Sequence, residues 1–205
     1  MEITCSNLSK KFHSEWVFKG LNFNFLSGQS YAIIGSNGSG KSTLLQCLSG
    51  MLPLTSGSIT YTDKNSEVAI EDFYKYISIA APYLELLEDY TLLEHINFHL
   101  QFIKLQDNLT AKEFISILRL DSSINKPIKN FSSGMKQKVK LGLAIYSDRP
   151  ILLLDEPTSN LDSKGILWYK EEVEKVNNRK LLIIGSNQEF EYDFCGETID
   201  MRMWK

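Results

Sequence analysis

The strongest constraint on the fold is a glycine-rich segment that lies between a short apolar run and a helical pattern. The apolar run, Ser30–Ile34, has the length and composition of a buried strand, and residues 43–48 continue as a helix. Between them, Gly35–Ser42 reads GSNGSGKS and matches the pattern GxxxxGK(S/T). In such a unit, glycines let backbone N–H groups turn inward, and the helix start adds a partial positive charge. The segment predicts a loop that wraps phosphate groups; a glycine-rich turn before a helix is the simpler alternative.

Three side chains at the end of this loop have expected tasks of their own. Lys41 is placed to reach the β- and γ-phosphates of a nucleotide, and the Ser42 hydroxyl to bind Mg²⁺, with Thr43 beside it. The loop backbone supplies the other predicted contacts to the phosphates. These nucleotide-binding positions are Ser36, Asn37, Gly38, Ser39 and Gly40.

Two acidic residues follow a second apolar run, Ile151–Leu154. The end of a strand is where a phosphate-loop ATPase needs a carboxylate beside Mg²⁺. We therefore expect Asp155 to hold the metal ion through water, and Glu156 to polarise the attacking water as general base. A solvated acidic turn is the competing interpretation, which the phosphate loop makes weaker.

The rest of the chain alternates strands and helices and indicates an α/β fold. A hairpin is expected around residues 58–70, helical spacing over residues 88–130, and a helix over 165–176 that lies between the apolar runs 151–154 and 181–184. Thr110 and Glu113 have the spacing of a capping box. Strands that alternate with helices predict a mostly parallel sheet with its ligand at the strand ends.

Composition excludes several classes of protein. The net charge of −3 argues against a large non-specific nucleic-acid surface. Three cysteines, odd in number and widely spaced, make a metal site or a disulfide framework improbable and favour a reducing compartment. No apolar run approaches the roughly 18–20 residues that cross a bilayer, and the first residues lack the pattern of a signal peptide. We expect a chain that reaches a membrane only through a partner.

A third motif makes the set resemble ABC-family ATPases, the nucleotide-binding subunits of ABC transporters. Residues 131–137 read FSSGMKQ and precede the acidic strand, where the family's signature reads LSGGQ. Ser132 and Gly134 match that signature, and residues 159–162 resemble the family's D-loop. The resemblance implies a phosphate-loop ATPase domain spanning residues 1–205, with an antiparallel β edge. Its core lobe is expected at about 1–87 and 148–205, and its helical lobe at about 88–147.

The resemblance also implies a dimer in which each ATP lies between two chains. In the family, the signature faces the phosphate loop of the second subunit, so Ser132, Ser133, Gly134 and the D-loop residue Asp162 are expected to contribute to the ATP site. Physically, serines at a helix start can receive a γ-phosphate, and they can equally cap a core helix. The nearby lysines are expected to form a solvated helix face, and a binding patch is the alternative: Lys136, Lys138 and Lys140.

Two positions depart from the family pattern. Asn187 stands where the family has a histidine that contacts the γ-phosphate; an amide donates a hydrogen bond but carries no proton near neutral pH, so we expect slower hydrolysis. The Q-loop glutamine is also missing, because residues 80–82 are Ala, Ala and Pro, which cannot ligate a metal. His95 and His99 match no motif and are expected on a helix surface rather than in a zinc site.

Aromatic and acidic residues suggest where the base and a partner bind. Phe12 lies where the family has an aromatic that stacks on adenine, Val17 is a neighbouring apolar contact, and Trp16 is an alternative platform. A core role for Phe12 is the competing interpretation. The segment 82–90 mixes apolar and acidic residues and is expected to accept a short helix from a membrane subunit, or else to be an ordinary loop.

The function implied by the resemblance is ATP binding and hydrolysis that drives a separate integral-membrane permease through nucleotide-dependent dimerisation. We expect ATP and Mg²⁺ as cofactors, a homodimer or heterodimer, no nucleic acid, and a place on the cytoplasmic face of the membrane. The form of the signature is more like exporter-type subunits. The alternatives are a soluble ABC ATPase without a transporter, and a degenerate subunit that is paired with a more active one.

Overall fold

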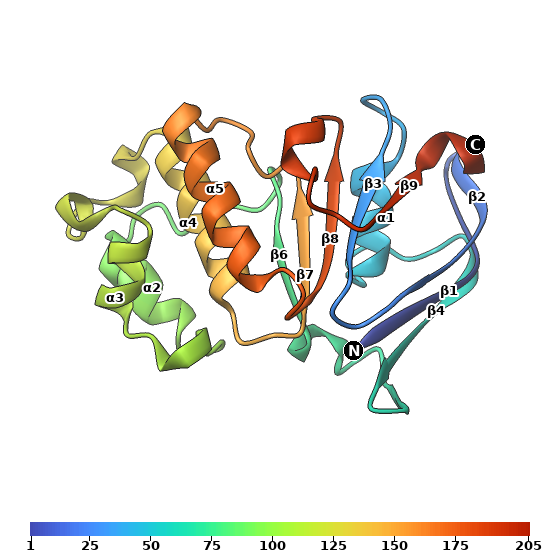
Figure 1. The fold of residues 1–205 in the computed structure, drawn as a ribbon, viewed down its shortest axis with the longest axis horizontal. Helices are drawn as coiled ribbons and strands as arrows, with labels where there is room; N and C mark the ends of the chain where they lie inside the picture. Colours follow the sequence, from blue (N-terminus) through green and yellow to red (C-terminus); the bar gives the residue numbers. More distant parts are fainter. The chain divides into compact units, whose positions relative to one another are not determined.

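The computed structural model describes all residues, Met1–Lys205, and its contacts divide the chain into two compact units (Figure 1). The sheet unit contains Met1–Ile79, Arg149–Glu156 and Val176–Lys205. The helical unit contains Ala80–Asp148 and Pro157–Lys175. Contacts therefore group residues 157–175 with the helical unit, whereas the sequence placed them in the core lobe.

The first sheet of the sheet unit is antiparallel and has the strand order β2-β1-β4-β5. Strands β1 and β2 form a long hairpin in which Ile3 pairs with Phe25 and Phe12 with Glu15. The expected hairpin around residues 58–70 is confirmed by the pairing of β4 with β5. Their bounds are β1 Glu2–Phe12, β2 Glu15–Phe25, β4 Ser56–Asp63 and β5 Ser66–Val68.

The second sheet has the strand order β6-β7-β8-β3-β9, and its pairs β7–β8, β8–β3 and β3–β9 are parallel. Every residue of β7 and of β8 is buried, as is typical of inner strands that are covered on both faces. The carboxyl ends of parallel strands share one edge of the sheet, where ligands bind in such folds. The bounds are β3 Ser30–Ile34, β6 Ile77–Ala80, β7 Ile151–Asp155, β8 Leu181–Ser186 and β9 Glu197–Asp200.

Helix α1, Lys41–Leu48, follows β3 and packs on β7 and β8 through buried leucines. The hydrophobic core of the sheet unit joins this helix to both sheets. The stacked rings of Tyr61 and Phe73, with centroids 3.5 Å apart, belong to this core. The remaining elements of this unit are the short 3₁₀ helices η1 Phe73–Lys75, η5 Glu189–Glu191 and η6 Met201–Trp204.

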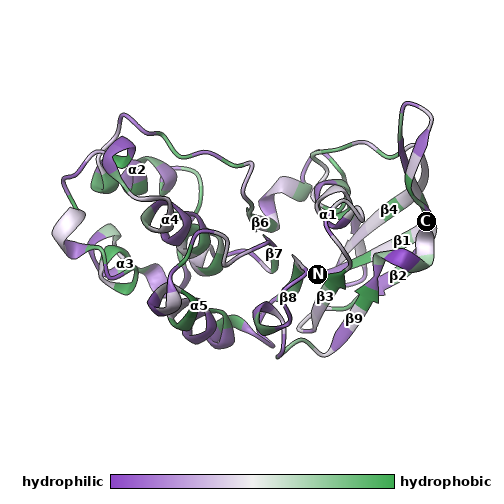
Figure 2. Ribbon diagram, turned by 90° about the horizontal axis from the view of Figure 1, so that it is seen from above, coloured by the Kyte–Doolittle hydropathy of each residue, from purple (hydrophilic) through white to green (hydrophobic).

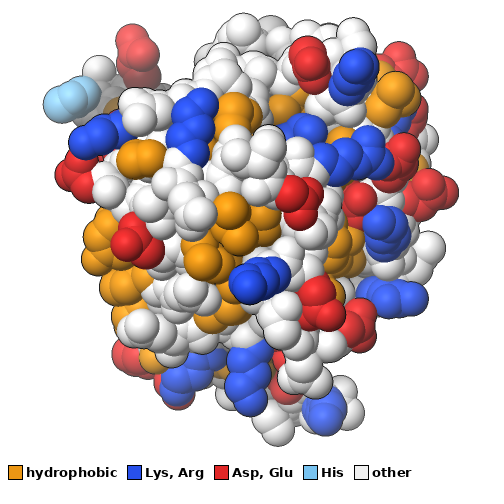
Figure 3. Space-filling model, turned by 90° about the vertical axis from the view of Figure 1, so that its left-hand side faces the viewer, with side chains coloured by type: hydrophobic (Ala, Val, Ile, Leu, Met, Phe, Trp, Pro, Cys, Tyr) orange, Lys and Arg blue, Asp and Glu red, His pale blue; other side chains and the backbone are white.

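The helical unit is built from four α-helices, each of which carries hydrophilic and hydrophobic residues (Figure 2). The predicted capping box of Thr110 and Glu113 is confirmed, and Thr91 and Glu94 form a second one. On the side that carries α2 and α3, hydrophobic side chains lie exposed among charged ones (Figure 3). The bounds are α2 Leu92–His99, α3 Ala111–Ile117, α4 Ser133–Tyr146 and α5 Ser163–Val176, with η2 Gln106–Asn108, η3 Asp121–Ser123 and η4 Ile128–Asn130 between them.

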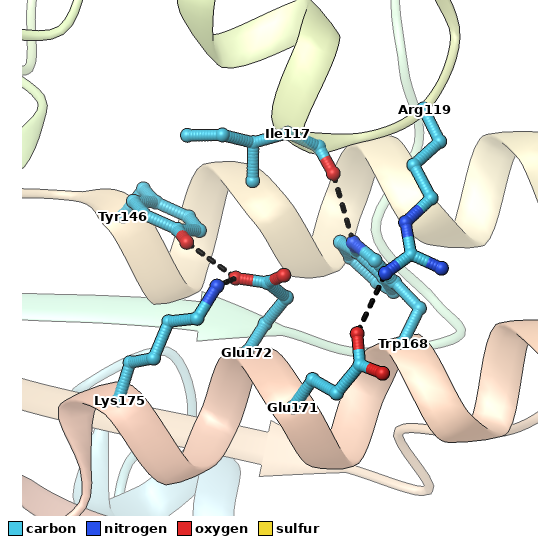
Figure 4. A network of polar contacts seen from close by, with 7 residues as sticks. All are labelled: Ile117, Arg119, Tyr146, Trp168, Glu171, Glu172 and Lys175. Carbon is cyan, nitrogen blue, oxygen red and sulfur yellow. Dashed lines mark hydrogen bonds and ion pairs between the residues drawn. The ribbon is translucent and has the colours of Figure 1, made fainter.

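Polar contacts hold α5 against its neighbours in the helical unit (Figure 4). The buried indole of Trp168 donates to the carbonyl of Ile117 at 3.0 Å. The buried carboxyl of Glu172 accepts from the hydroxyl of Tyr146 and lies 2.6 Å from the ammonium of Lys175. Burial is the main cause that raises the pKa of the Tyr146 phenol, and the hydrogen bond to Glu172 is the second cause. None of the helices combines the length and the hydropathy that crossing a bilayer requires.

Candidate active site

The phosphate loop connects β3 to α1 and depends on glycine at two points. Gly35 and Gly40 have φ of 148° and 104°, in the region that L side chains rarely adopt. A Cβ at Gly35 would lie 2.5 Å from the Ser39 hydroxyl oxygen, and one at Gly40 would lie 2.6 Å from Val17. Close approach as well as conformation therefore excludes larger residues here.

Lys41 lies at the start of α1 with its side chain folded into the loop. It is buried, and its ammonium donates to the carbonyls of Gly35 at 3.0 Å and Ser36 at 3.2 Å. The loop thus holds a cation at the place where the sequence predicts phosphate oxygens. A cavity of about 320 Å³ opens over this loop and is lined by the predicted base Glu156 and by eight of the predicted nucleotide-binding residues: Phe12, Val17, Asn37, Gly38, Gly40, Lys41, Ser42 and Thr43. The predicted loop residues Ser36 and Ser39 do not line it.

Phe12 borders this cavity at the end of the β1–β2 hairpin and is 47% exposed, so a core role for this ring is wrong. Val17 lies beside it in the cavity wall, as expected. Trp16 is also exposed, but it does not line the cavity, and the ammonium groups of Lys11 and Lys19 lie 5.3 and 5.4 Å from the centre of its ring. The geometry therefore favours Phe12 over Trp16 as the platform for a base.

Asp155 ends β7 as a buried carboxyl beside the loop. Burial raises its pKa to about 6, a hydrogen bond from the Ser42 hydroxyl opposes that rise, and the neighbouring Glu156 adds to it. Its Oδ1 atom is buried without a hydrogen-bond partner. A buried, unsatisfied carboxylate oxygen next to a hydroxyl is a donor set that suits a hard divalent cation.

Glu156 occupies an uncommon backbone conformation. Its φ of 43° is left-handed, which costs a residue with a side chain on the order of 1–2 kcal/mol. Its N–H donates to the carbonyl of Gly185 at 2.9 Å, which holds the turn in place. The Glu156 side chain is only partly buried and lines the cavity, which is the position that a general base requires.

Asn187 follows β8 and reaches the phosphate loop. The parallel register pairs Ser186 with Ile34, so the next residues of both segments leave the sheet side by side. The amide of Asn187 donates to Asn37 Oδ1 at 3.0 Å. The sequence indicated that Asn187 belongs near the γ-phosphate, but it carried no signal for the contact with Asn37, which depends on pairing between distant strands.

A second hollow, of about 300 Å³, lies in the helical unit at the start of α4. Ser132 is the N-cap of this helix, and its hydroxyl accepts from the N–H of Met135 at 3.2 Å. A Cβ on Gly134 would lie 2.9 Å from the carbonyl oxygen of Asn160, so the signature and the D-loop segment are in close contact. Predicted residues of both segments line the hollow: Ser132, Ser133, Gly134 and Asp162.

Asp162 has a structural task in addition to its place in the hollow, because its carboxylate accepts from the N–H of Gly165 at 2.8 Å in the first turn of α5. The buried side chain of Gln137 donates to the carbonyl of Pro157 at 2.8 Å and forms a second link between α4 and this segment. Nothing in the sequence indicated this role of Gln137, because an amide side chain on a helix is usually exposed.

The expectation of a solvated lysine face on α4 is wrong. Lys136 forms an ion pair with Glu88 at 2.5 Å, and the ammonium of Lys138 lies 5.4 Å from the centre of the Trp168 ring. All three lysines are partly buried, and burial is the main cause that lowers the pKa values of Lys138 and Lys140. The surface position expected for His95 is also wrong, because this side chain is buried and its pKa is lowered by burial.

The fold and the site define a phosphate-loop ATPase, and comparison with known proteins identifies the family. Residues 18–159 match the family described as ABC transporter. The chain is 30% identical over 197 residues to the uncharacterized ABC transporter ATP-binding protein YybJ of Bacillus subtilis, covering 95% of this chain and 90% of that protein. It is 31% identical over 183 residues to the lantibiotic transport ATP-binding protein SrtF of Streptococcus pyogenes, covering 88% of this chain and 77% of that protein. The chain belongs to the ABC transporter family and is an ATP-binding ATP hydrolase.

Solved structures share this fold at lower sequence identity. A putative ABC transporter ATP-binding protein from Pyrococcus furiosus superimposes with a TM-score of 0.82 at 20% identity and covers all of both chains. The ATP-binding cassette MJ0796, in a dimeric post-hydrolysis state with ADP and Pi, also superimposes with a TM-score of 0.82 at 24% identity, covering 97% of this chain and 93% of that one. The expected α/β fold with an antiparallel edge and a helical insert is confirmed.

Proposed function

We propose that this chain is the nucleotide-binding subunit of a transporter and that ATP closes two such subunits into a dimer. The observation that carries the proposal is that the chain has two separate half-sites. The cavity over the phosphate loop is lined by Lys41 and Glu156, and the hollow at α4 has a serine-capped helix start. A helix start of this kind suits a γ-phosphate. The dimeric state of MJ0796 with ADP and Pi supports completion of each cavity by the hollow of a second subunit.

Magnesium fits the residues at the end of β7. Ser42 and Asp155 would hold the ion, because the hydroxyl and the carboxyl are hydrogen-bonded neighbours and Asp155 Oδ1 has no partner. The ion, when bound, supplies positive charge to the β- and γ-phosphates. Lys41 would exchange its carbonyl contacts for phosphate oxygens, and Glu156 would accept the proton of the attacking water.

Asn187 would donate a neutral hydrogen bond to the γ-phosphate from its place beside Asn37. A neutral amide stabilises the developing charge less than a protonated imidazole does, which is why we expect slow turnover. This feature also favours a second candidate, a degenerate subunit that is paired with a more active relative. The turnover of the purified chain, compared with that of Glu156→Gln, separates the two, because a degenerate subunit gives the same low rate in both.

The surface for a membrane subunit would lie on the helical unit. Tyr83, Leu87 and Tyr90 are exposed in the segment 82–90, and the aromatic series continues from Tyr90 through Phe98 to Phe102, with ring centroids 5.9 and 5.2 Å apart. Exposed aromatic rings rimmed by acidic groups are typical of a protein interface. We place a short helix of an integral-membrane permease here, with the chain on the cytoplasmic face of the membrane.

Dimerisation is tested with Glu156→Gln, which keeps the cavity and removes the base. The expected result is a dimer in ATP and a monomer without nucleotide, measured by light scattering after size exclusion. Lys41→Ala is the matched control and should stay monomeric. A Glu156→Gln chain that remains monomeric in saturating ATP contradicts the proposal.

The docking surface is tested with a photo-crosslinker in native membranes. A crosslinker at Glu85, in the proposed surface, should capture an integral-membrane protein, whereas one at Glu174, exposed on α5, should not. Equal capture from both positions, or capture of soluble proteins only, would favour an ABC ATPase without a transporter.

A further inference from the structure

We infer that Glu191 and Ser186 form a buried pair that positions Asn187 against the phosphate loop. Glu191 is then a positioning residue that acts through Ser186 and does not touch the nucleotide. The inference rests on the proposed role of Asn187 at the γ-phosphate. It adds two residues to the site that neither the motifs nor the cavity lining indicates.

Asn187 needs such support because it stands at the end of a strand and is exposed. Strand β8 ends at Ser186, and no ladder of the sheet extends to Asn187. Its side chain contacts the phosphate loop through one hydrogen bond, which it donates to Asn37 at 3.0 Å. The direction of the Asn187 side chain therefore depends on the turn that follows the strand.

Hydrogen bonds on both sides of Asn187 fix this turn. The hydroxyl of Ser186, which is fully buried, donates to the Glu191 carboxyl, and the same oxygen accepts from the N–H of Gln188 at 2.8 Å. The N–H of Glu191 donates to the carbonyl of Gln188 at 3.0 Å. The residue before Asn187 and the residue after it are thus held by one hydroxyl group, which Glu191 orients.

The chemistry of a carboxyl group explains why Glu191 suits this task. A serine hydroxyl has one proton to donate and can accept through its lone pairs. When that proton goes to Glu191, the oxygen stays free to accept from Gln188. The other acceptor within reach is the carbonyl of Gln188, at 3.4 Å, which is a long contact. Without Glu191, the hydroxyl would turn toward that carbonyl, and the Gln188 N–H would lose its acceptor.

The burial of Glu191 also supports its role in positioning Asn187. The side chain is 2% exposed, and burial of a carboxyl is unfavourable unless hydrogen bonds compensate it. The carboxyl lies close enough to Asp155 to raise the pKa of that group as well, so Glu191 belongs to the edge of the sheet that carries the site.

The test is a double-mutant cycle on ATP turnover by the full chain. Ser186→Ala and Glu191→Ala should each lower kcat by about tenfold with little change in KM for MgATP, because misplacement of a group near the reacting atoms costs rate on that scale or more. Combining Ser186→Ala with Asn187→Ala should be no slower than Asn187→Ala alone. Glu191→Gln, which keeps an acceptor for the hydroxyl, should retain most of the rate.

Two control variants separate positioning from loss of a buried polar group. Ser78→Ala removes a buried hydroxyl that donates to the carbonyl of Ile151 at 3.1 Å on β7, and Glu172→Gln neutralises a buried carboxyl in the helical unit. Both should leave kcat close to that of the unmodified chain. If Ser78→Ala lowers kcat as much as Ser186→Ala does, the effect is general destabilisation and the inference is overturned.

Amide hydrogen exchange gives a readout that does not need turnover. Ser186→Ala should speed exchange of the Gln188 N–H by about tenfold or more and shift the side-chain amide resonance of Asn187, while Ser78→Ala changes neither. Rate losses that multiply in the double mutant, or an unchanged Gln188 exchange rate, would overturn the inference. If Asn187→Ala leaves kcat unchanged while both signals move in Ser186→Ala, the positioning stands and the proposed role of Asn187 fails.

Discussion

The buried carboxyl of Asp155 makes the stability of the nucleotide-free chain depend on pH. Its folded-state pKa of about 6 lies above the ordinary value of 3.8, chiefly because of burial. The folded chain therefore binds this proton more tightly than the unfolded chain does. Between these two values, the free energy of unfolding falls as pH rises, and above pH 6 the chain carries the full cost of a buried charge.

Replacement of this carboxyl with the neutral Asp155→Asn side chain should remove that cost. At about 1.4 kcal/mol for each tenfold change in proton affinity, the two pKa values give at most about 3 kcal/mol of added stability at pH 7. For a chain of this length, that corresponds to a rise in Tm of about 6–12 °C. Below pH 3.8, Asp155 is protonated in both the folded and the unfolded native chain, so the variant and the native chain should be equally stable there.

The measurement is urea unfolding without nucleotide or magnesium, at intervals from about pH 3 to 8. Asp148→Asn, which changes an exposed aspartate, is the matched control and should follow the native curve. The same Asp155→Asn chain should lose the stabilisation that MgATP gives to the native chain. A stability difference that does not vary with pH, or a variant less stable than the native chain at pH 7, refutes the reasoning.

Three further predictions concern single groups of the site. Phe12→Ala should weaken ATP binding by about 1–3 kcal/mol in calorimetry, whereas Trp16→Ala, outside the cavity, should leave it nearly unchanged; equal losses contradict the assignment. Gly134→Ala should abolish ATP-dependent dimerisation but keep ATP binding to the single chain, because its Cβ would lie 2.9 Å from the Asn160 carbonyl; light scattering decides. Asn187→His should raise kcat and introduce a pH dependence near 6.5, and a flat pH–rate profile argues against γ-phosphate contact.

Local chemistry explains why much of the site could be predicted from the sequence. The phosphate loop needs glycines at fixed spacing, and Gly35 and Gly40 show why, since both their φ values and their close contacts exclude a side chain. Asp155 is the last residue of a wholly buried strand, so an apolar run that ends in acids marks the edge of the sheet. The Thr110 capping box is likewise a contact within one helical turn.

What the sequence could not supply comes from packing between distant segments. Lys136 and Glu88 are 48 positions apart, and nothing local distinguishes a lysine that pairs from one in solvent. The contact of Asn187 with Asn37 depends on the pairing of β8 with β3. The buried pair of Ser186 and Glu191 looks in sequence like ordinary polar residues near the end of a strand, because the burial of Glu191 depends on packing within the whole sheet unit.

The resting contacts of Lys41 have a consequence for the choice of ligand. The Lys41 ammonium already donates hydrogen bonds to the carbonyls of Gly35 and Ser36, so exchanging them for contact with one weak anion would be little more favourable. A lone inorganic phosphate or sulphate must compete with two fixed dipoles for the same cation, whereas a polyphosphate brings several oxygens at once. We therefore expect the loop to favour a ligand with several linked phosphoryl groups over a single phosphate or sulphate ion.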